Sequence, residues 1–334
     1  MKTVGIVVTE RCQASSVFTV VDLLMAANFA ATEFLAGDAT PFAWRLLGLQ
    51  AQATAYNGCS VRPIDPVGEC SRPDIVLVPG IFEAVLSVSH MKKLLLRLQS
   101  LDSPLQAWHA AGTVVGSVCT GNFLVAGAGL AAGRTLTCHW ASARNARQLF
   151  PAETFVAEKM LIDHGDLVSA GGALAVTQLV LYLLQRFHSR ELALATAKLM
   201  MVEPSFASQS RFAMFSPSKA HGDQMVEVLQ RHIEQHIDST INFSVYAQAG
   251  GITERQLNRR FKKATGETPL SYQQRMRIEH VKHALENSQK RLNTLVWETG
   301  YEDLTSFRRL FKRYTGMTMQ DYRTRFSAMT LSAR

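Results

Sequence analysis

The chain has 334 residues, of which 47% are hydrophobic and 19% are charged. This length exceeds that of one ordinary domain and predicts two, and the composition excludes a wholly disordered protein. The five cysteines are odd in number and include no CxxC pair, which argues against a disulfide framework and for reduced thiols in a cytosol.

The positive charge is concentrated toward the C-terminus. Residues 222–334 carry 18 Lys and Arg against 12 Asp and Glu, so they account for +6 of the total net charge of +8. A basic domain attracts a polyanion because binding releases counterions from it. Nucleic acid is therefore the leading partner for this part of the chain.

Hydropathy predicts no membrane segment. The first residues, MKTVGIVVTER, contain too short an apolar run for a secretory signal and predict a strand instead. The longest apolar stretch, 173–184, spans about twelve residues, whereas a membrane span needs roughly 18. We expect a cytoplasmic protein. The histidines show no metal-ligand spacing, and we expect neither a metal nor a cofactor.

Residues 1–202 alternate short β-rich runs with helical patterns, which predicts a parallel sheet covered by helices. The expected strands are 3–9, 45–49, 74–78 and 113–119. The expected helices are 16–34, then 85–112 with a break near Pro104, and 175 to about 202. Residues 159–162 and 167–169 flank an Asp-His-Gly-Asp turn, which predicts a hairpin.

Residues 203–221 contain Pro204, Pro217 and five serines without clean periodicity, and we interpret them as an interdomain linker. From there to residue 334 the pattern is helical. An internal repeat stands out in this part. Several residues recur at an offset of 50, including Gly250 with Gly300, Arg259 with Arg309, Phe261-Lys262 with Phe311-Lys312, Thr265-Gly266 with Thr315-Gly316, and Tyr272 with Tyr322.

Each copy predicts a helix, a tight turn and a second helix. In the first copy, residues 243–249 end at Gly250-Gly251, where glycine permits a positive φ. Thr253 then caps the second helix, and Gln256 completes a capping box. That helix ends at Gly266. In the second copy the turn is expected at Gly300 and the cap at Asp303.

The second helix of each copy has an apolar face and a basic face. The residues expected to be buried are Leu257, Phe261 and Ala264 in the first copy and Phe307, Leu310 and Phe311 in the second. The opposite faces carry Arg, Asn and Lys, which suit base edges and phosphates in a major groove. A merely solvated surface is the alternative, but the repeat, the turns and the charge excess together argue against it.

Residues 222–334 resemble the DNA-binding domain of the AraC family, whose signature is close to GYEDLTSFRRLFKRYTGMTMQDYR at 300–323. Met319 stands where that family usually has proline, and we expect it to occupy the same helical position. The resemblance implies two helix-turn-helix units joined by a connector helix, 271–286, and reading successive major-groove segments.

Matching motif positions assigns roles within the two units. The residues expected to contact bases are Arg255, Gln256, Asn258 and Arg259 in the first unit and Leu304, Thr305, Ser306, Arg308 and Arg309 in the second. The residues expected to contact phosphate are Lys262, Lys263, Lys312 and Arg313.

In the first domain, a buried strand runs into a Gly-rich turn at Cys119 and then into a helix. A thiol at a helix N-terminus has a lowered pKa when the helix dipole dominates, and the turn builds an oxyanion-type pocket. His139 follows twenty residues later as a base or hydrogen-bond partner. Cys12 and Cys138 are expected in the core or the pocket wall.

Residues 1–200 resemble the PfpI-like branch of the class I glutamine-amidotransferase-like superfamily, which implies a flavodoxin-like fold with a cysteine elbow. Joined to an AraC-type domain, this gives the GlxA-type regulator arrangement. The resemblance places the family's Cys and His at Cys119 and His139, and Ser16 where the enzymes have a carboxylate. Thr120 stands where some relatives have His. The acid–base equipment for efficient hydrolysis is therefore incomplete.

We expect a transcription regulator, an activator, controlled by a small effector in the first domain. The expected ligand-binding residues are Ser16, Gly80, Ile81, Cys119, Thr120, His139 and Trp140. The resemblance suggests an amino acid or quaternary amine, with double-stranded DNA, RNA polymerase and a second copy of the chain as partners. The alternatives for Cys119 are a structural thiol, a residual amidase or hydrolase nucleophile, and a redox sensor.

Overall fold

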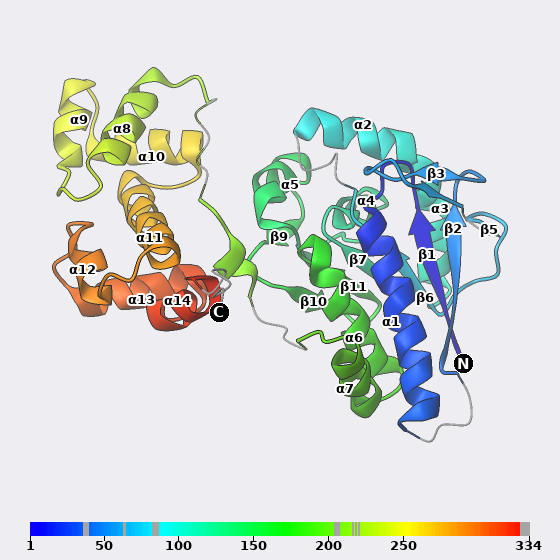
Figure 1. The fold of residues 1–334 in the computed structure, drawn as a ribbon. Helices are drawn as coiled ribbons and strands as arrows, with labels where there is room; N and C mark the ends of the chain where they lie inside the picture. The colour runs from blue at the N-terminus through cyan, green and yellow to red at the C-terminus, as the bar shows by residue number, and fades with distance from the viewer. Residues whose placement is uncertain are drawn as a thin grey trace. The chain divides into compact units, whose positions relative to one another are not determined.

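The computed structural model divides into two compact units, Met1–Gln209 and Ser210–Arg334 (Figure 1). Each unit has its own architecture. The residues that the structure describes are 1–35, 40–62, 65–81, 87–203, 208–215, 217, 219 and 221–327.

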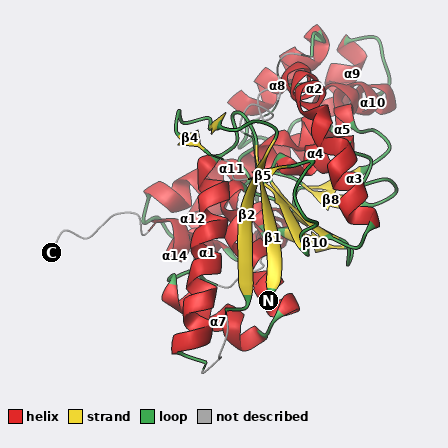
Figure 2. Cartoon of the chain, turned by 90° about the vertical axis from the view of Figure 1, so that its right-hand side faces the viewer, coloured by secondary structure: helices red, strands yellow, loops and turns green. Residues whose placement is uncertain are grey.

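The first unit is built on a mostly parallel sheet. Within the described residues, seven strands pair in the order β10-β11-β7-β6-β1-β2-β5, and only β10 runs antiparallel to its neighbour. The strands are β1 (Lys2–Val8), β2 (Phe42–Gly48), β5 (Asp65–Pro66), β6 (Ile75–Val78), β7 (Val114–Val118), β10 (Leu161–Asp163) and β11 (Leu167–Ala170). Figure 2 shows β1 and β2 side by side along their whole length. The predicted sheet and the β10–β11 hairpin are confirmed.

Helices cover both faces of this sheet. One face carries α1 (Ala14–Glu33), α6 (Val176–Phe187) and α7 (Arg190–Leu199). The other carries α2 (Val88–Leu98), α3 (Asp102–Ala110), α4 (Gly121–Gly127) and α5 (Ala143–Leu149). Adjacent residues of β1 divide between the two cores, because Ile6 packs on the α1 side and Val7 on the α2 side. The flavodoxin-like, doubly wound fold is confirmed.

Short elements complete the unit. They are the antiparallel pair β3 (Ala53–Thr54) and β4 (Ser60–Val61), the parallel pair β8 (Thr135–Thr137) and β9 (Thr154–Val156), and the 3₁₀ turns η2 (Gln99–Leu101), η3 (Trp140–Ser142) and η4 (Ala173–Ala175).

The expected helix 175–202 is wrong as a single helix. α6 ends at Phe187 and α7 begins at Arg190, because Ser189 adopts an extended backbone and its Oγ accepts a hydrogen bond from Leu192 N at 3.1 Å. A serine in that geometry starts a new helix. The expected break near Pro104 in the helical segment 85–112 is confirmed: α2 and α3 are separated by η2, and Pro104 lies in the first turn of α3, where its missing N–H is tolerated. Residues 85 and 86 lie outside the described residues.

Helix α1 is long and apolar enough to span a membrane by length and composition, with a mean hydropathy of 1.5 over its best window. Sequence inspection missed this property. Half of that window is buried within the unit, and residues such as Leu23 and Ala27 pack into the core beside α6 and α7. The helix is therefore a core helix by its packing. Its outward face exposes Phe18, Met25 and Phe29.

A polar cluster anchors the β10–β11 hairpin. The carboxylate of Asp166 accepts two hydrogen bonds from Arg134, at 2.6 and 2.9 Å, and lies 2.7 Å from His109 Nε2. The Arg134 guanidinium is the main cause that lowers the pKa of Asp166 to about 2, although partial burial opposes it and the His109 bond assists. The cluster joins three segments that are distant in sequence.

Asp166→Asn is expected to destabilise the protein above pH 4 by about 1 kcal/mol. The effect is small because the Asp166 side chain is 41% exposed and solvent screens its interaction with Arg134. Because folding lowers this pKa, the stabilisation is present above the ordinary carboxyl pKa and is lost as the pH falls toward 2. Urea unfolding of both proteins at pH 5, 3.5 and 2.5 measures it. A stability difference that is constant over this range would contradict the assignment.

The segment predicted as a linker, 203–221, contains the boundary between the units and is partly packed. The 3₁₀ turn η5 (Gln209–Phe212) lies within it. Gln209 is 3% exposed, and its Nε2 lies within hydrogen-bond distance of Thr137 Oγ1, Cys138 O and Lys159 O. Gly171 makes room for it, since a Cβ there would lie 1.8 Å from Gln209 Nε2. The chain is thus fixed to the first unit immediately before the second begins.

The second unit is helical within its described residues. Its helices are α8 (Gln224–Gln235), α9 (Phe243–Ala249), α10 (Glu254–Thr265), α11 (Pro269–Asn287), α12 (Leu292–Trp297), α13 (Leu304–Thr315) and α14 (Met319–Phe326). The all-helical prediction is confirmed. Met319 begins α14 at the position where the AraC-type pattern has proline, and it is buried.

The sequence repeat is also a repeat of packing. In the first copy the rings of Phe261 and Tyr272 meet edge to face with centroids 5.4 Å apart, and in the second Phe311 and Tyr322 do so at 5.6 Å. Each copy has its own apolar core, and α11 contributes to both, with Tyr272 in one and Val281 in the other. The connector helix therefore fixes the two copies to each other through side-chain packing.

Candidate DNA interface and effector pocket

The first helix-turn-helix consists of α9, a turn and α10. Thr253 Oγ1 accepts from Gln256 N at 3.3 Å, and Gln256 Oε1 accepts from Thr253 N at 2.8 Å, so the predicted capping box is present. Gly251 has φ +66°, whereas Gly250 has an ordinary φ and instead admits the Met225 side chain, 2.3 Å from where a Cβ would stand. Gly251 thus supplies the positive φ of the turn, whereas Gly250 leaves room for the end of the Met225 side chain.

The outward face of α10 is basic. Leu257 and Phe261 are fully buried, which turns the opposite side of the helix to solvent. Of the residues expected to contact DNA, Asn258 is half-buried and the exposed ones are Arg255, Gln256, Arg259, Lys262 and Lys263. The Gln256 carboxamide oxygen is engaged in the cap, so this residue has a structural role whatever it contacts on DNA.

The second helix-turn-helix consists of α12, a turn at Gly300 and α13. Gly300 has φ +70°, and a Cβ there would lie 1.6 Å from Asp238 O, so only glycine fits. Asp303 caps α13, because its Oδ1 accepts from Thr305 N at 2.8 Å and from Ser306 N at 3.0 Å. Ser306 Oγ also donates to Asp303, at 2.6 Å, which gives Ser306 a second role in the cap.

An open groove of about 410 Å³ runs along the outer face of α13. Four of the expected contact residues line it at i, i+3, i+4, i+7 spacing: Thr305, Arg308, Arg309 and Lys312. All four are exposed, as is Arg313, and Leu304 is half-buried against the core. Arg308 Nη2 donates to Asn293 Oδ1 at 2.9 Å, which orients the guanidinium.

Sequence reasoning missed part of this groove. Leu292, Thr318 and Gln320 also line it, from α12 and the start of α14. A signal was available for Thr318, since it is the N-cap that follows the Gly316 turn. Helix N-termini present backbone N–H groups that suit phosphate.

In the first unit, Cys119 lies at a sharp strand-to-helix turn between β7 and α4. Its φ of +57° is rare for a residue with a side chain, and Cys119 N donates to Ala170 O at 2.8 Å, which helps to hold the turn. Gly121 follows, where a Cβ would stand 2.4 Å from Val78 O and 2.7 Å from Pro79 O. The predicted elbow is therefore present, and glycine allows it to pack against the end of β6.

The expected lowering of the Cys119 pKa is wrong. Cys119 is 5% exposed, and burial raises the pKa of its thiol to about 11, with smaller opposing contributions from hydrogen bonds to Thr120. Desolvation disfavours a thiolate more than one short helix favours it. Burial therefore favours the protonated thiol over the thiolate.

The elbow brings together most of the expected ligand-binding residues. Thr120 Oγ1 accepts from Ile81 N and donates to Ile81 O, both at 2.7 Å. A Cβ on Gly80 would lie 3.2 Å from Cys119 Cβ and 3.3 Å from Gln13 Oε1, so Gln13 borders the elbow as well. Sequence reasoning missed Gln13, which precedes α1 and carries no motif.

Ser16 and His139 do not form a catalytic set with the thiol. Ser16 is fully buried and its Oγ donates to Ala173 O at 3.5 Å. His139 Nδ1 accepts from Ala141 N at 3.1 Å, its ring packs on Trp140, and burial lowers its pKa. Among the described residues no hydrogen bond joins Cys119 to either side chain.

Asn122 is the polar residue that sequence reasoning missed behind the elbow. It is fully buried, and its Nδ2 donates to Thr137 O at 2.9 Å and to Ala170 O at 3.0 Å. Thr137 Oγ1 is also a partner of Gln209. A continuous set of buried hydrogen bonds thus runs from the elbow helix to the segment that leads into the second unit.

These features agree with comparisons to known proteins. A family model described as the DJ-1/PfpI family matches residues 4–186, more than half of the chain. The chain belongs to the DJ-1/PfpI family. A second model, described as a helix-turn-helix domain, matches residues 246–325. The chain therefore joins a DJ-1/PfpI domain to an AraC-type helix-turn-helix domain.

Relatives share this arrangement. The chain is 24% identical to the HTH-type transcriptional regulator GbdR of Pseudomonas aeruginosa over 84% of its own length and 75% of that protein. It is 24% identical to the HTH-type transcriptional regulator GlxA of Rhizobium meliloti over 64% of its own length and 66% of that protein. The solved structure of Drosophila melanogaster DJ-1beta matches 60% of this chain and 98% of its own, with 15% identity and a TM-score of 0.50. This likeness supports the fold of the first unit.

Proposed function

We propose that this protein is a transcription regulator that reads double-stranded DNA with α10 and α13. The observation that carries the proposal is the duplication: two capped helices have the same buried Phe–Tyr pair and each turns an arginine-bearing face outward. A solvated surface helix needs neither the duplicated packing nor the shared connector α11. Both relatives described above are named as transcriptional regulators.

The first unit supplies the effector response in this proposal. A small metabolite, an amino acid or quaternary amine, binds at the elbow among Gly80, Ile81, Cys119 and Thr120, and its differential affinity for two arrangements of the chain shifts DNA binding. The Asn122, Thr137 and Gln209 hydrogen bonds support this idea, because they lead from the elbow to the last residue of the first unit.

The partners expected from the sequence beyond DNA stay predictions. The exposed Phe18, Met25 and Phe29 on α1 support pairing with a second copy, since these side chains form one apolar strip on a helix face. Contact with RNA polymerase and the sign of regulation rest on the AraC-type resemblance alone.

Selection of genomic fragments by the full-length protein tests the proposal. We expect enrichment of specific fragments over random duplex at moderate salt, and a change in affinity when arginine, carnitine or betaine is added. The same compounds should raise the melting temperature if they bind only the folded protein. Equal affinity for every duplex, with and without these compounds, would show that the proposed function is wrong.

A further inference from the structure

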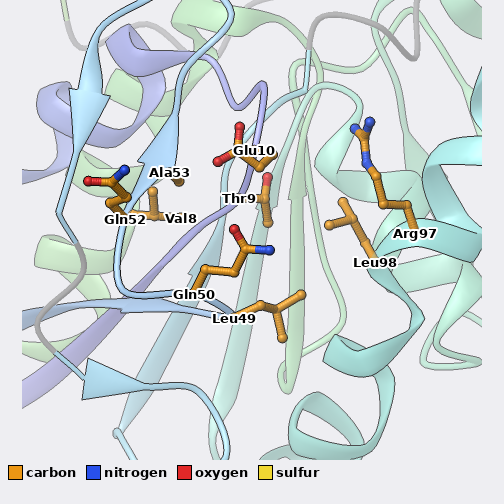
Figure 3. A pocket seen from close by; sticks show the side chains of 9 residues that line it. All are labelled: Val8, Thr9, Glu10, Leu49, Gln50, Gln52, Ala53, Arg97 and Leu98. Carbon is orange, nitrogen blue, oxygen red and sulfur yellow. The ribbon is translucent and has the colours of Figure 1, made fainter.

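A cavity lies in the first unit at the carboxyl ends of β1 and β2, apart from the elbow. Its volume is about 90 Å³, and none of the elbow residues Gly80, Cys119 or Thr120 lines it. Arg97 and Leu98, at the end of α2, form one side of the cavity, and Val8 and Ala53 also line it. Figure 3 shows these two residues across the hollow from Glu10, Thr9 and Gln50.

The wall of this cavity contains a buried hydroxyl without a partner. Thr9 is 4% exposed, and its Oγ1 makes no hydrogen bond to any of the residues that the structure describes. Burying a hydroxyl in this state destabilises the folded protein, and such groups in native proteins call for an explanation. A solute in the cavity that hydrogen-bonds to Thr9 removes that cost, because Thr9 lines the cavity.

The charged groups around the cavity are opposite in sign. Glu10 is held in place by Thr54 N, which donates to its Oε1 at 3.0 Å, and Arg97 stands on the facing side. Gln50 and Gln52 add uncharged amides. Among the described residues that line the cavity, Glu10 and Arg97 are the charged ones, and a ligand that carries both charges can face each with the opposite sign.

The size of the cavity limits the ligand further. A cavity needs roughly 10–15 Å³ of volume to hold one water molecule, so a cavity of about 90 Å³ accommodates a molecule of several non-hydrogen atoms. Nucleotides and sugar phosphates are too large for a cavity of this volume. Apolar wall residues such as Leu98 suit a short hydrocarbon part between the charges.

We propose that this cavity is a second small-molecule site that binds a compact zwitterion, a free amino acid of the size of glycine, alanine or serine. Its ammonium group donates to Glu10 and to Thr9 Oγ1, and its carboxylate faces Arg97 and the amides of Gln50 and Gln52. The site depends neither on the effector at the elbow nor on DNA binding, so it can be tested separately from the proposed function.

Calorimetric titration of the full-length protein with glycine, L-alanine and L-serine tests the proposal, with methylamine and acetate as compounds that each carry one of the charges. We expect at least one amino acid to bind and both half-ligands to bind at least about tenfold more weakly. Thr9→Val should weaken amino-acid binding about tenfold, and Glu10→Gln should weaken it more. Cys119→Ala should leave the affinity unchanged.

Melting temperatures give an independent test of whether the buried Thr9 hydroxyl lacks a hydrogen-bond partner. Without ligand, Thr9→Val should raise the melting temperature by about 2 °C, because it removes an unpartnered buried hydroxyl. The matched control is Thr113→Val, which should lower it, because the equally buried Thr113 Oγ1 donates to Pro73 O at 2.7 Å.

Three outcomes would overturn the proposal. One is that no amino acid in the set binds. Another is that binding survives Thr9→Val but is lost in Cys119→Ala, which would place the ligand at the elbow. The third is that Thr9→Val lowers the melting temperature as Thr113→Val does, which would mean that a structural water satisfies Thr9.

Discussion

Arg259→Ala and Arg309→Ala are each expected to weaken binding to a specific DNA site by 1–3 kcal/mol, about 5- to 150-fold in affinity. These residues occupy equivalent positions of the repeat, both are exposed, and both lie opposite a buried phenylalanine. Bidentate contact between a guanidinium and guanine is the commonest specific contact in a major groove. Fluorescence anisotropy with a selected duplex and a random duplex of equal length measures the effect.

The two arginines test base reading better than their neighbours do. Gln256 and Ser306 hydrogen-bond within the helix caps, so their loss also destabilises the helix. Arg308 is tied to Asn293, and removing it frees that amide. Loss of Arg259 or Arg309 breaks no hydrogen bond among the described residues, so a weaker complex would report on DNA rather than on folding.

Arg231→Ala is the matched control, because Arg231 is an exposed arginine on α8, outside both reading helices. It removes the same charge and should lower affinity for both duplexes slightly and equally. Loss of specific affinity in Arg231→Ala as large as in Arg309→Ala would mean that net charge alone drives binding. Unchanged affinity in both reading-helix variants would remove α10 and α13 as reading elements.

Local patterns were sufficient to predict the second unit. Its caps and turns are formed by residues within four positions of each other, such as Thr253 with Gln256 and Asp303 with Ser306. The buried stripe of α13, Phe307, Leu310 and Phe311, likewise follows from helical spacing. What the sequence did not reveal is that Gly250 and Gly300 also leave room for Met225 and Asp238, which are distant in the chain.

The first unit shows where local reasoning is insufficient. The elbow at Cys119 was predictable from a strand, a Gly-rich turn and a helix, but its thiol pKa was not, because burial by distant segments outweighs the local helix. The break at Ser189 needed the knowledge that its hydroxyl caps α7. Gln209 carries no motif, and only Gly171 and Thr137, which are far away in sequence, explain its burial.

Gly121→Ala is expected to lower the stability of the first unit by on the order of 3 kcal/mol and to abolish its response to an elbow ligand. The added Cβ would stand 2.4 Å from Val78 O and 2.7 Å from Pro79 O. Both are backbone atoms, so the clash cannot be relieved by a rotamer change. It would separate the start of α4 from the end of β6 and move Cys119 away from Gly80.

The matched control is Gly68→Ala, because no atom lies within 4 Å of a Cβ at Gly68 and its φ is not positive. This variant should melt within about 1 °C of the original protein, whereas Gly121→Ala should melt roughly 6–12 °C lower for a unit of this size. DNA affinity without effector separates two mechanisms. If the elbow acts only through the effector, Gly121→Ala retains basal DNA binding at a temperature where both units are folded. If the hydrogen bonds from Asn122 to Gln209 also determine how the protein without effector binds DNA, the basal DNA affinity of Gly121→Ala changes as well. A Gly121→Ala melting temperature equal to that of Gly68→Ala would contradict the steric argument.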